Sequence, residues 1–153
     1  GIQDDRPYEI FTGKIEEDAM YIPRKVKKGN IIKVKDKDGE SRYDFQYEDR
    51  YGYTNTIGGI SRLFDEEFWN YARLISGVLR HGMPIIDVVA LIESLHLDSE
   101  TINTWKNGVE RALKKYISNG TKAKQACPNC GEDSLVYQNG CPVCMSCGYS
   151  KCG

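Results

Sequence analysis

The C-terminal stretch CPNCGEDSLVYQNGCPVCMSCGYSKCG, residues 127–153, holds all six cysteines of the 153-residue chain. It contains few apolar side chains, so a segment of this length has little means of folding by hydrophobic burial alone. Two CxxC pairs, Cys127 with Cys130 and Cys144 with Cys147, are each followed by glycine. In such a knuckle, backbone N–H groups point at the sulfur atoms, and glycine lets the chain turn away without a Cβ clash. The stretch therefore predicts a zinc ribbon.

The choice of zinc ligands leaves one alternative open. Cys141 and Cys144 also form a CxxC pair, which could serve as the second knuckle if Cys141 replaced Cys147. We prefer the set that contains Cys147, because a glycine follows Cys147 whereas a methionine follows Cys144. The spare thiols are then Cys141 and Cys152, and in the alternative they are Cys147 and Cys152.

The two spare thiols predict redox chemistry. Cys152 is the penultimate residue and lies beside Lys151, a cation that favours the thiolate needed for thiol–disulfide exchange. A second thiol nearby would complete a dithiol shuttle, which attacks a disulfide elsewhere and releases it by closing its own. The alternative is that the spare thiols are unused.

Composition places this tail on a globular chain. Apolar residues make up 40% and charged residues 28%, and the formal net charge is -1. No apolar run approaches the roughly 18 residues needed to cross a bilayer, and the first residues lack the pattern of a signal peptide. We expect a cytoplasmic protein with no membrane partner, in which clustered cysteines bind metal or react rather than form structural disulfides. A first residue of Gly rather than Met predicts a segment of something longer.

The first zone of the chain, up to about Arg62, predicts a small antiparallel sheet. Apolar residues lead into the Asp-Gly turn of DKDGE, residues 36–40, after which Tyr43, Phe45 and Tyr47 alternate with polar residues. The pattern predicts a hairpin whose aromatic side chains share one face. We interpret this face as core packed against helices rather than as a stacking platform for bases, because alternating aromatics are usual on a half-buried strand.

Three helices are predicted next. The first starts near Asp65 and is ended by Gly82, the second covers the very apolar residues 85–95, and the third is capped by Asp98 or Ser99. The apolar stripes of the first and third helices comprise Phe68, Tyr71, Ala72, Ile75, Val78 and Leu79, and Ile102, Trp105, Val109, Leu113 and Tyr116.

The predicted fold class is α+β, a small antiparallel sheet packed with about three helices and followed by a flexible linker and a zinc ribbon. The accessory domain covers residues 1–117. Residues 118–126, SNGTKAKQA, are small and polar without periodicity and predict the linker. Residues 127–153 form the ribbon with its redox-active tail.

Three segments together look like the C-terminal region of adenosylcobalamin (vitamin B12)-dependent, class II ribonucleotide reductases. They are RPYEIFTGK at residues 6–14, INTWKNGVERALKKYI at 102–117 and GCPVCMSCGYSKCG at 140–153. These enzymes convert ribonucleotides, such as ribonucleoside diphosphates, to deoxyribonucleotides for DNA replication, and they oxidise two active-site cysteines in each turnover. The resemblance implies a mobile dithiol that re-reduces this disulfide and is itself reduced by a thioredoxin-like protein.

Within the resemblance, the shuttle role falls on Cys141 and Cys152, with Cys147 as the second choice for Cys141. The zinc ligands are then Cys127, Cys130, Cys144 and Cys147. The catalytic barrel and its cobalamin site have no counterpart here, so the chain alone is not expected to reduce nucleotides. We expect it to act with the barrel as its partner, either as the end of a longer chain or as a separate small subunit.

A second class of function is a zinc-ribbon adaptor for proteins or a structural cap, with no redox role. Binding of nucleic acid is disfavoured, because the ribbon carries one basic residue, Lys151, against Glu132 and Asp133. The adaptor and the cap both predict that the spare cysteines can be replaced without loss of function.

Overall fold

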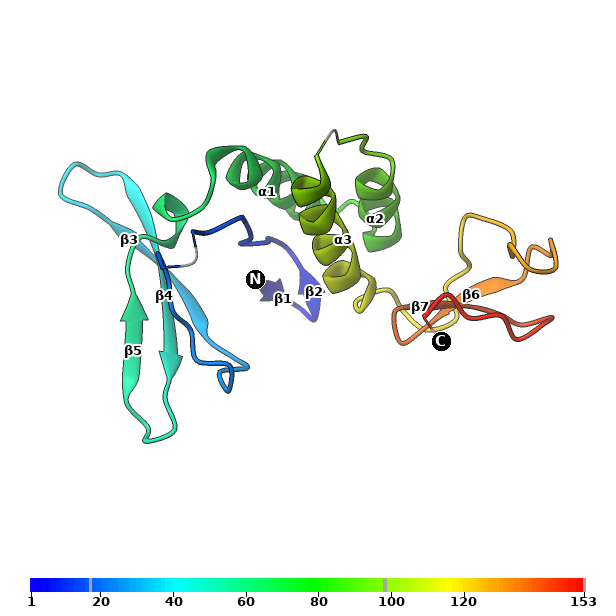
Figure 1. Ribbon diagram of the computed structural model, residues 1–153, viewed down its shortest axis with the longest axis horizontal. Coiled ribbons are helices and arrows are strands. Elements are labelled where there is room, and N and C mark those ends of the chain that lie inside the picture. Colours follow the sequence, from blue (N-terminus) through cyan, green and yellow to red (C-terminus); the bar gives the residue numbers. More distant parts are fainter. Residues whose placement is uncertain (17, 98, 153) are drawn as a thin grey trace. The chain divides into compact units, whose positions relative to one another are not determined.

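The computed structural model describes residues 1–16, 18–97 and 99–152, and the chain divides into two compact units (Figure 1). The first unit comprises Gly1 and Phe11–Arg73, and the second comprises Ile2–Ile10 and the chain from Leu74 onward. Small antiparallel sheets and three helices make up the fold, which confirms the predicted α+β class. Within the described ranges, none of the helices is both long enough and apolar enough to span a bilayer.

A three-stranded antiparallel sheet dominates the first unit, in the order β3 (Asn30–Lys35), β4 (Ser41–Glu48) and β5 (Thr54–Ile57). In the turn between β3 and β4, the Asp36 carboxylate accepts two backbone N–H groups at 2.9 and 3.1 Å. Gly39 in the same turn has φ of 80°, a conformation that costs glycine little. The predicted hairpin is therefore confirmed.

The aromatic face of β4 packs inside the first unit. The ring of Tyr43 lies 5.1 Å from that of Phe11 and 6.2 Å from that of Trp69, measured between centroids. Phe45 stacks on Tyr47 at 5.9 Å. All three β4 rings are half-buried. For Tyr43, which meets the helix residue Trp69, the interpretation of this face as core is confirmed.

The opposite face of β4 holds a buried carboxylate. Asp44 is 5% exposed and accepts both Nε and Nη2 of Arg42 at 2.9 Å, and also the Gly59 N–H at 2.7 Å. The hydrogen bonds from Arg42 and then from Gly59 lower the pKa of the Asp44 carboxyl, against the opposing effect of burial. This group ties β4 to the turn that precedes the short 3-10 helix η1 (Ile60–Arg62).

Helix α1 (Glu66–Arg80) begins and ends as predicted. At the start of the helix, the Asp65 side chain accepts the Glu67 N–H at 3.0 Å. At the end of the helix, Gly82, with φ of 83°, donates to the Leu79 carbonyl at 3.0 Å. Buried side chains follow the spacing of three and four residues that faces one side of a helix. They are Phe68, Ala72, Ile75 and Leu79.

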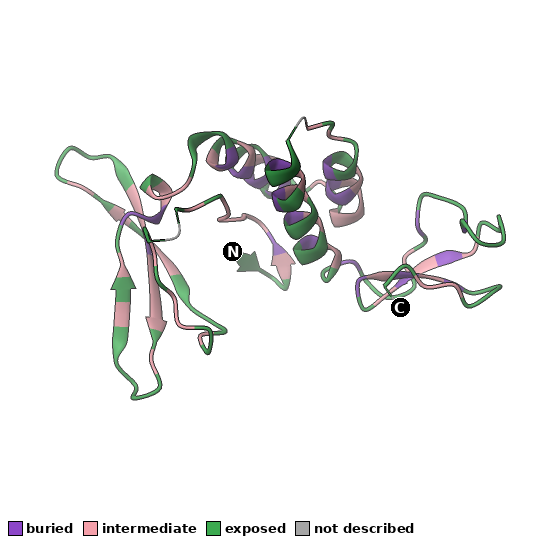
Figure 2. Cartoon of the chain, in the orientation of Figure 1, coloured by how far each residue is buried: buried purple, intermediate pink, exposed green. Residues whose placement is uncertain are grey.

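Helices α2 (Ile85–Glu93) and α3 (Glu100–Lys114) complete the helical core of the second unit. Helix α2 ends two residues before the predicted limit, and at this end the Ser94 hydroxyl donates to the Leu91 carbonyl at 2.7 Å. Both helices carry residues coloured as buried in Figure 2. The buried set comprises Val88, Val89, Ile92, Ile102, Trp105, Val109 and Leu113.

The ends of α3 settle two further predictions. Ser99 caps the helix by accepting the Ile102 N–H at 3.2 Å, whereas Asp98, the other predicted cap, lies outside the described residues. Tyr116 was predicted on the apolar stripe and is exposed. Helix α3 stops at Lys114, so the helical spacing no longer decides which of the following residues face the core. Ile117 is buried there instead of Tyr116.

The N-terminal residues join the helical unit rather than the sheet. Strands β1 (Ile2–Gln3) and β2 (Arg6–Pro7) form a small hairpin. The Ser76 hydroxyl on α1 accepts the Ile10 N–H at 3.0 Å and donates to the Ile10 carbonyl at 3.2 Å. The sequence prediction had placed these residues with the sheet, because two-residue strands leave no alternation of apolar and polar positions to detect.

Residues 118–126, predicted as a flexible linker, make backbone hydrogen bonds with strand β6 (Leu135–Gln138). Gly120 donates to Tyr137, and Ala123 donates to Leu135, at 2.8 and 2.9 Å. Ala123 is also buried. Backbone pairing of this kind requires no apolar side chains, so the composition of the segment gave no sign of it. The division into three domains stays a prediction.

Candidate metal centre and surface disulfide

The cysteine ribbon, which we define as residues 127–152, is built on a hairpin of β6 and β7 (Cys141–Cys144). Asn139 and Gly140 turn the chain with φ of 50° and 80°, as an Asn-Gly hairpin turn requires. A Cβ atom on Gly140 would lie 3.0 Å from the carbonyl oxygen of Lys114. The glycine thus allows the hairpin to approach the end of α3 closely.

The two predicted knuckles have matching geometry. Gly131 donates its N–H to the Cys127 carbonyl at 2.8 Å, and Gly148 donates to the Cys144 carbonyl at 3.0 Å. The two glycines have φ of 75° and 74°, so each bends the chain away as the glycine argument supposed. The knuckles point toward each other, and they hold four of the six cysteines.

The structure brings the four predicted metal ligands together. The Sγ atoms of Cys127, Cys130, Cys144 and Cys147 all lie within 4.8 Å of one another. Two of the pairs, Cys127 with Cys147 and Cys130 with Cys144, are separated by 3.7 and 3.6 Å. Four sulfurs bound tetrahedrally to zinc at about 2.3 Å lie roughly 3.8 Å apart, so the observed spacing fits. The cluster could therefore hold a metal ion.

Polar neighbours favour thiolates in the second knuckle. A hydrogen bond from Ser134, at 3.1 Å, is the main cause that lowers the pKa of Cys144, to about 6, and backbone N–H groups add to it. The Asn129 amide donates to Cys147 at 3.5 Å and is the main cause of the lowered pKa of that thiol. Metal binding requires deprotonated sulfur, so these contacts prepare ligands.

The pKa of Cys130 is shifted in the opposite direction, toward the neutral thiol. The backbone N–H of Glu132 favours its thiolate, but burial and hydrogen bonds with the other three cysteines outweigh this and raise the pKa of Cys130 to about 12. Four sulfurs at this spacing cannot all be ionised without a cation between them. A bound dication would remove the conflict, which is a second reason that the cluster fits a metal.

The two remaining cysteines are joined to each other. Cys141 and Cys152 form a disulfide, with Cα atoms 6.0 Å apart, so Cys141 does not contribute to the sulfur cluster. Cys152 is exposed and Cys141 is half-buried. The grouping of all six cysteines is that of the preferred assignment, while their roles as ligands and as a shuttle stay predictions.

The last described residues fold back on the ribbon. Tyr149 accepts the Cys144 N–H at 2.8 Å, and Ser150 forms a β-bridge with Val143, so the last residues fold back along β7. The disulfide fixes this return. In the oxidised form, the terminal cysteine is held at the surface of the ribbon rather than on an extended arm.

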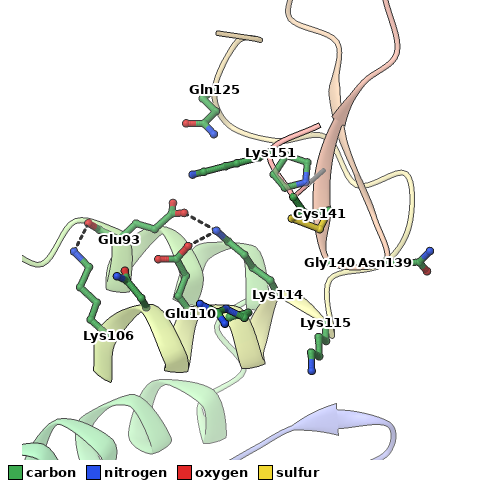
Figure 3. Close-up of a pocket in the computed structure, with 14 residues that line it drawn as sticks. Glu93, Lys106, Glu110, Lys114, Lys115, Gln125, Asn139, Gly140, Cys141 and Lys151 are labelled. Atoms are coloured by element: carbon green, nitrogen blue, oxygen red, sulfur yellow. Dashed lines mark hydrogen bonds and ion pairs between the residues drawn. A yellow bond between two sulfur atoms is a disulfide. The ribbon is translucent and has the colours of Figure 1, made fainter. Parts of the chain in front are cut away.

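A pocket of about 830 Å³ lies between the disulfide and helix α3 (Figure 3). Lys114, at its floor, forms ion pairs with Glu110 and with Glu93, the latter at 2.9 Å. Lys106 donates to the carbonyls of Glu93 and Leu95 at 2.9 and 2.6 Å. The proximity of these lysines to the disulfide depends on tertiary structure, so the sequence alone gives no sign of it.

Comparison with protein families decides the relationship of the first 118 residues. A family model described as "NrdJ homologue C-terminal domain" matches residues 1–118. The chain belongs to this family. No curated protein and no solved structure matches the chain.

An NrdJ homologue C-terminal domain is a region related to class II ribonucleotide reductase, so the resemblance found in the sequence is confirmed. Membership indicates a role associated with ribonucleotide reductase. The match ends before Cys127 and leaves the ribbon outside it. The chemistry of the ribbon therefore has to be argued from its own residues.

Asn129 and Ser134, the polar neighbours of the sulfur cluster, were not identified from the sequence. Asn129 lies between the two cysteines of the first knuckle, a position that could have drawn attention to it. Ser134 is ten residues from Cys144, and only the pairing of β6 with β7 brings the two side chains together.

Proposed function

We propose that this chain is the redox-active C-terminal part of an adenosylcobalamin-dependent, class II ribonucleotide reductase. The observation that carries the proposal is the division of the six cysteines. Four sulfurs form a compact cluster suited to zinc, and the other two are paired with each other at the surface. Zinc bound by the four would fix the ribbon, so that Cys141 and Cys152 stay close enough to open and close reversibly.

The proposed reaction is a two-step thiol–disulfide exchange. The Cys152 thiolate, the more exposed of the pair, attacks one sulfur of the disulfide in the catalytic barrel and displaces the other as a thiolate. Cys141 then attacks Cys152 in this mixed disulfide. The Cys141–Cys152 bond re-forms, two electrons pass to the barrel, and its two thiolates take up protons.

The partners and cofactors follow from this role. The catalytic barrel, in the same polypeptide or as a separate subunit, binds adenosylcobalamin and reduces ribonucleotides. A thioredoxin-like dithiol protein returns two electrons to the Cys141–Cys152 disulfide. Such a cycle requires a reducing compartment such as the cytoplasm.

The test joins the reduced, zinc-loaded chain to the catalytic barrel of a class II reductase and counts deoxyribonucleotides formed per enzyme. We expect Cys141→Ser and Cys152→Ser each to stop turnover once the barrel's own thiols are consumed. Met145→Ala, an exposed residue of the same ribbon, is the matched control and should turn over normally. Cys141→Ser should also accumulate a mixed disulfide between Cys152 and the barrel, visible by mass spectrometry.

Normal turnover by both serine variants would contradict the shuttle and favour the adaptor or structural cap. The mixed disulfide could instead form through Cys141 in the Cys152→Ser variant and be absent from the Cys141→Ser variant. That result would keep the function and exchange the roles of the two cysteines.

A further inference from the structure

The Cys141–Cys152 disulfide forms part of the wall of the pocket beside α3, rather than a flat surface. Its volume, about 830 Å³, falls within the range of roughly 300–1,000 Å³ typical of small-molecule sites. A ligand in this pocket would lie against a bond that can react with it. The proposed shuttle does not account for the pocket.

Cations outnumber anions around the pocket. Its lining includes two carboxylates, Glu93 and Glu110, and five basic side chains, so the formal charge of the lining is three positive. The basic residues are Lys106, Arg111, Lys114, Lys115 and Lys151.

The two carboxylates are already engaged. Both form ion pairs with Lys114. Burial raises the pKa of Glu93, but its hydrogen bond and attraction to Lys114, with a weaker effect of Lys151, lower it overall. Glu93 therefore remains an ionised partner of Lys114, and Glu110 is paired with the same lysine, so neither carboxylate is free to repel an anion.

Three cations of the pocket are left for a ligand. Arg111, Lys115 and Lys151 are exposed, and none of them forms an ion pair among the residues that the structure describes. The C-terminus of α3 itself favours nearby cations, which accounts for Arg111 and Lys115 in part. Lys151 comes instead from the ribbon, beside Cys152, and extends over the pocket near Cys141 in Figure 3.

We infer that this pocket binds a small thiol that carries carboxylate groups, and that this thiol reduces the Cys141–Cys152 disulfide directly. The inference rests on the proposed shuttle and adds a second source of electrons besides a dithiol protein. A concave site of this size encloses a small molecule, whereas protein partners recognise broader surfaces.

The reaction consumes two thiols. The first, as a thiolate, attacks the Cys152 sulfur, breaks the bond to Cys141 and forms a mixed disulfide, and Cys141 takes up a proton. The second attacks the ligand's sulfur in that mixed disulfide. Cys152 leaves as a thiol, the two ligand molecules depart as their own disulfide, and the cysteine pair has gained two electrons and two protons.

The test compares three thiols of different charge on the full, zinc-loaded chain. Mercaptosuccinate carries two carboxylates, 2-mercaptoethanol is neutral and cysteamine is cationic. The rate at which each thiol opens the disulfide is measured by mass spectrometry after alkylation. Each rate is then divided by the rate at which the same thiol reduces a small neutral disulfide. This division corrects for differences in the intrinsic reactivity of the thiols. We expect mercaptosuccinate to exceed 2-mercaptoethanol about tenfold at low salt, with cysteamine slowest. High salt should reduce the difference.

A matched pair of double variants assigns the effect to the pocket. Arg111→Gln with Lys115→Gln should bring the ratio of anionic to neutral thiol to within about twofold, because two of the three available charges are lost. Arg24→Gln with Lys28→Gln removes one arginine and one lysine charge from the first unit, none of whose described residues lines the pocket, and should leave the ratio unchanged.

Equal normalised rates for all three thiols would overturn the inference and leave the shuttle intact. So would a preference for the anionic thiol that survives in the Arg111 and Lys115 variant. The inference would also fail if a dithiol protein opened the disulfide, no small thiol did so, and the Arg111 and Lys115 variant slowed the reaction with the protein. The cations would then bind a protein partner instead. A disulfide that no thiol and no dithiol protein can open would count against the shuttle itself.

Discussion

The helical core and the cysteine ribbon of the second unit are stabilised in different ways. In the helical core, Leu79 and Val88 are 0% exposed, and the other buried side chains from the three helices are also mostly apolar. In the ribbon, the buried residues include two cysteines, Cys127 and Cys144, beside Leu135 and Tyr137. One region is held by apolar area removed from water, and the other centres on four sulfur atoms. The difference predicts which perturbation each region will tolerate.

Removal of metal should have the largest effect, and only on the ribbon. Zinc in a site of four cysteines contributes roughly 10 kcal/mol or more to the folded state, so a chelator should unfold residues 127–149. Amide NMR spectra should show these signals collapse to disordered positions, while those of α1 keep their dispersion. If the ribbon signals stayed dispersed in metal-free protein, packing and the disulfide would be sufficient to fold it.

Truncation of the helical core should have the next largest effect. Leu79→Ala removes a fully buried side chain and should lower the free energy of unfolding by about 3 kcal/mol, measured by urea denaturation. Leu74→Ala, on the same helix but 70% exposed, should change it by less than about 0.5 kcal/mol. Similar losses for the two variants would mean that α1 does not pack as the structure shows.

The same contrast explains how much the sequence could predict. The stripe of α1 and the CxxC pairs are local patterns, in which spacing along the chain fixes the face of a helix or the ligands of a knuckle. The strand pairing of residues 118–126 and the docking of Ile10 on Ser76 join backbone groups that are distant in sequence. Neither leaves a periodic trace, and neither was predicted.

The sites follow the same rule. The four clustered cysteines were identified because their spacing carries the chemistry. The pocket beside Cys141 was not, because its wall combines α3 with a ribbon that returns to it across the turn at Gly140. Side chains that line one pocket only because of the tertiary structure, such as Arg111 and Lys151, have no signature in a single sequence.

The sheet of the first unit adds a third means of stabilisation, the buried charge of Asp44. Asp44→Asn should lower the free energy of unfolding by about 2 kcal/mol near neutral pH, because the Arg42 side chain loses a charged acceptor. The pKa of Asp44 is lowered in the folded state, so its contribution is complete above the usual value of 3.8 and disappears as pH falls below it.

Urea denaturation at several pH values measures this effect. The gap between the native chain and Asp44→Asn should close in acid, since protonation removes the charge from the native chain as well. Asp38→Asn, in the exposed turn between β3 and β4, is the control and should show no such gap. A gap that persisted unchanged at low pH would assign the loss to packing rather than to charge.

The smallest effect is expected where residues 118–126, which pair with strand β6 of the ribbon, meet helix α2. Lys124 forms an ion pair with Asp87 of α2, but the two side chains are 59% and 38% exposed. A double-mutant cycle of Lys124→Gln and Asp87→Asn should therefore give a coupling energy below about 0.5 kcal/mol. Tyr137 and Ala123 are buried and line a small pocket together with residues of α2, so we expect apolar burial to contribute more than this exposed ion pair. A coupling energy well above 1 kcal/mol, and its loss at high salt, would show instead that charge holds residues 118–126, and the ribbon paired with them, on helix α2.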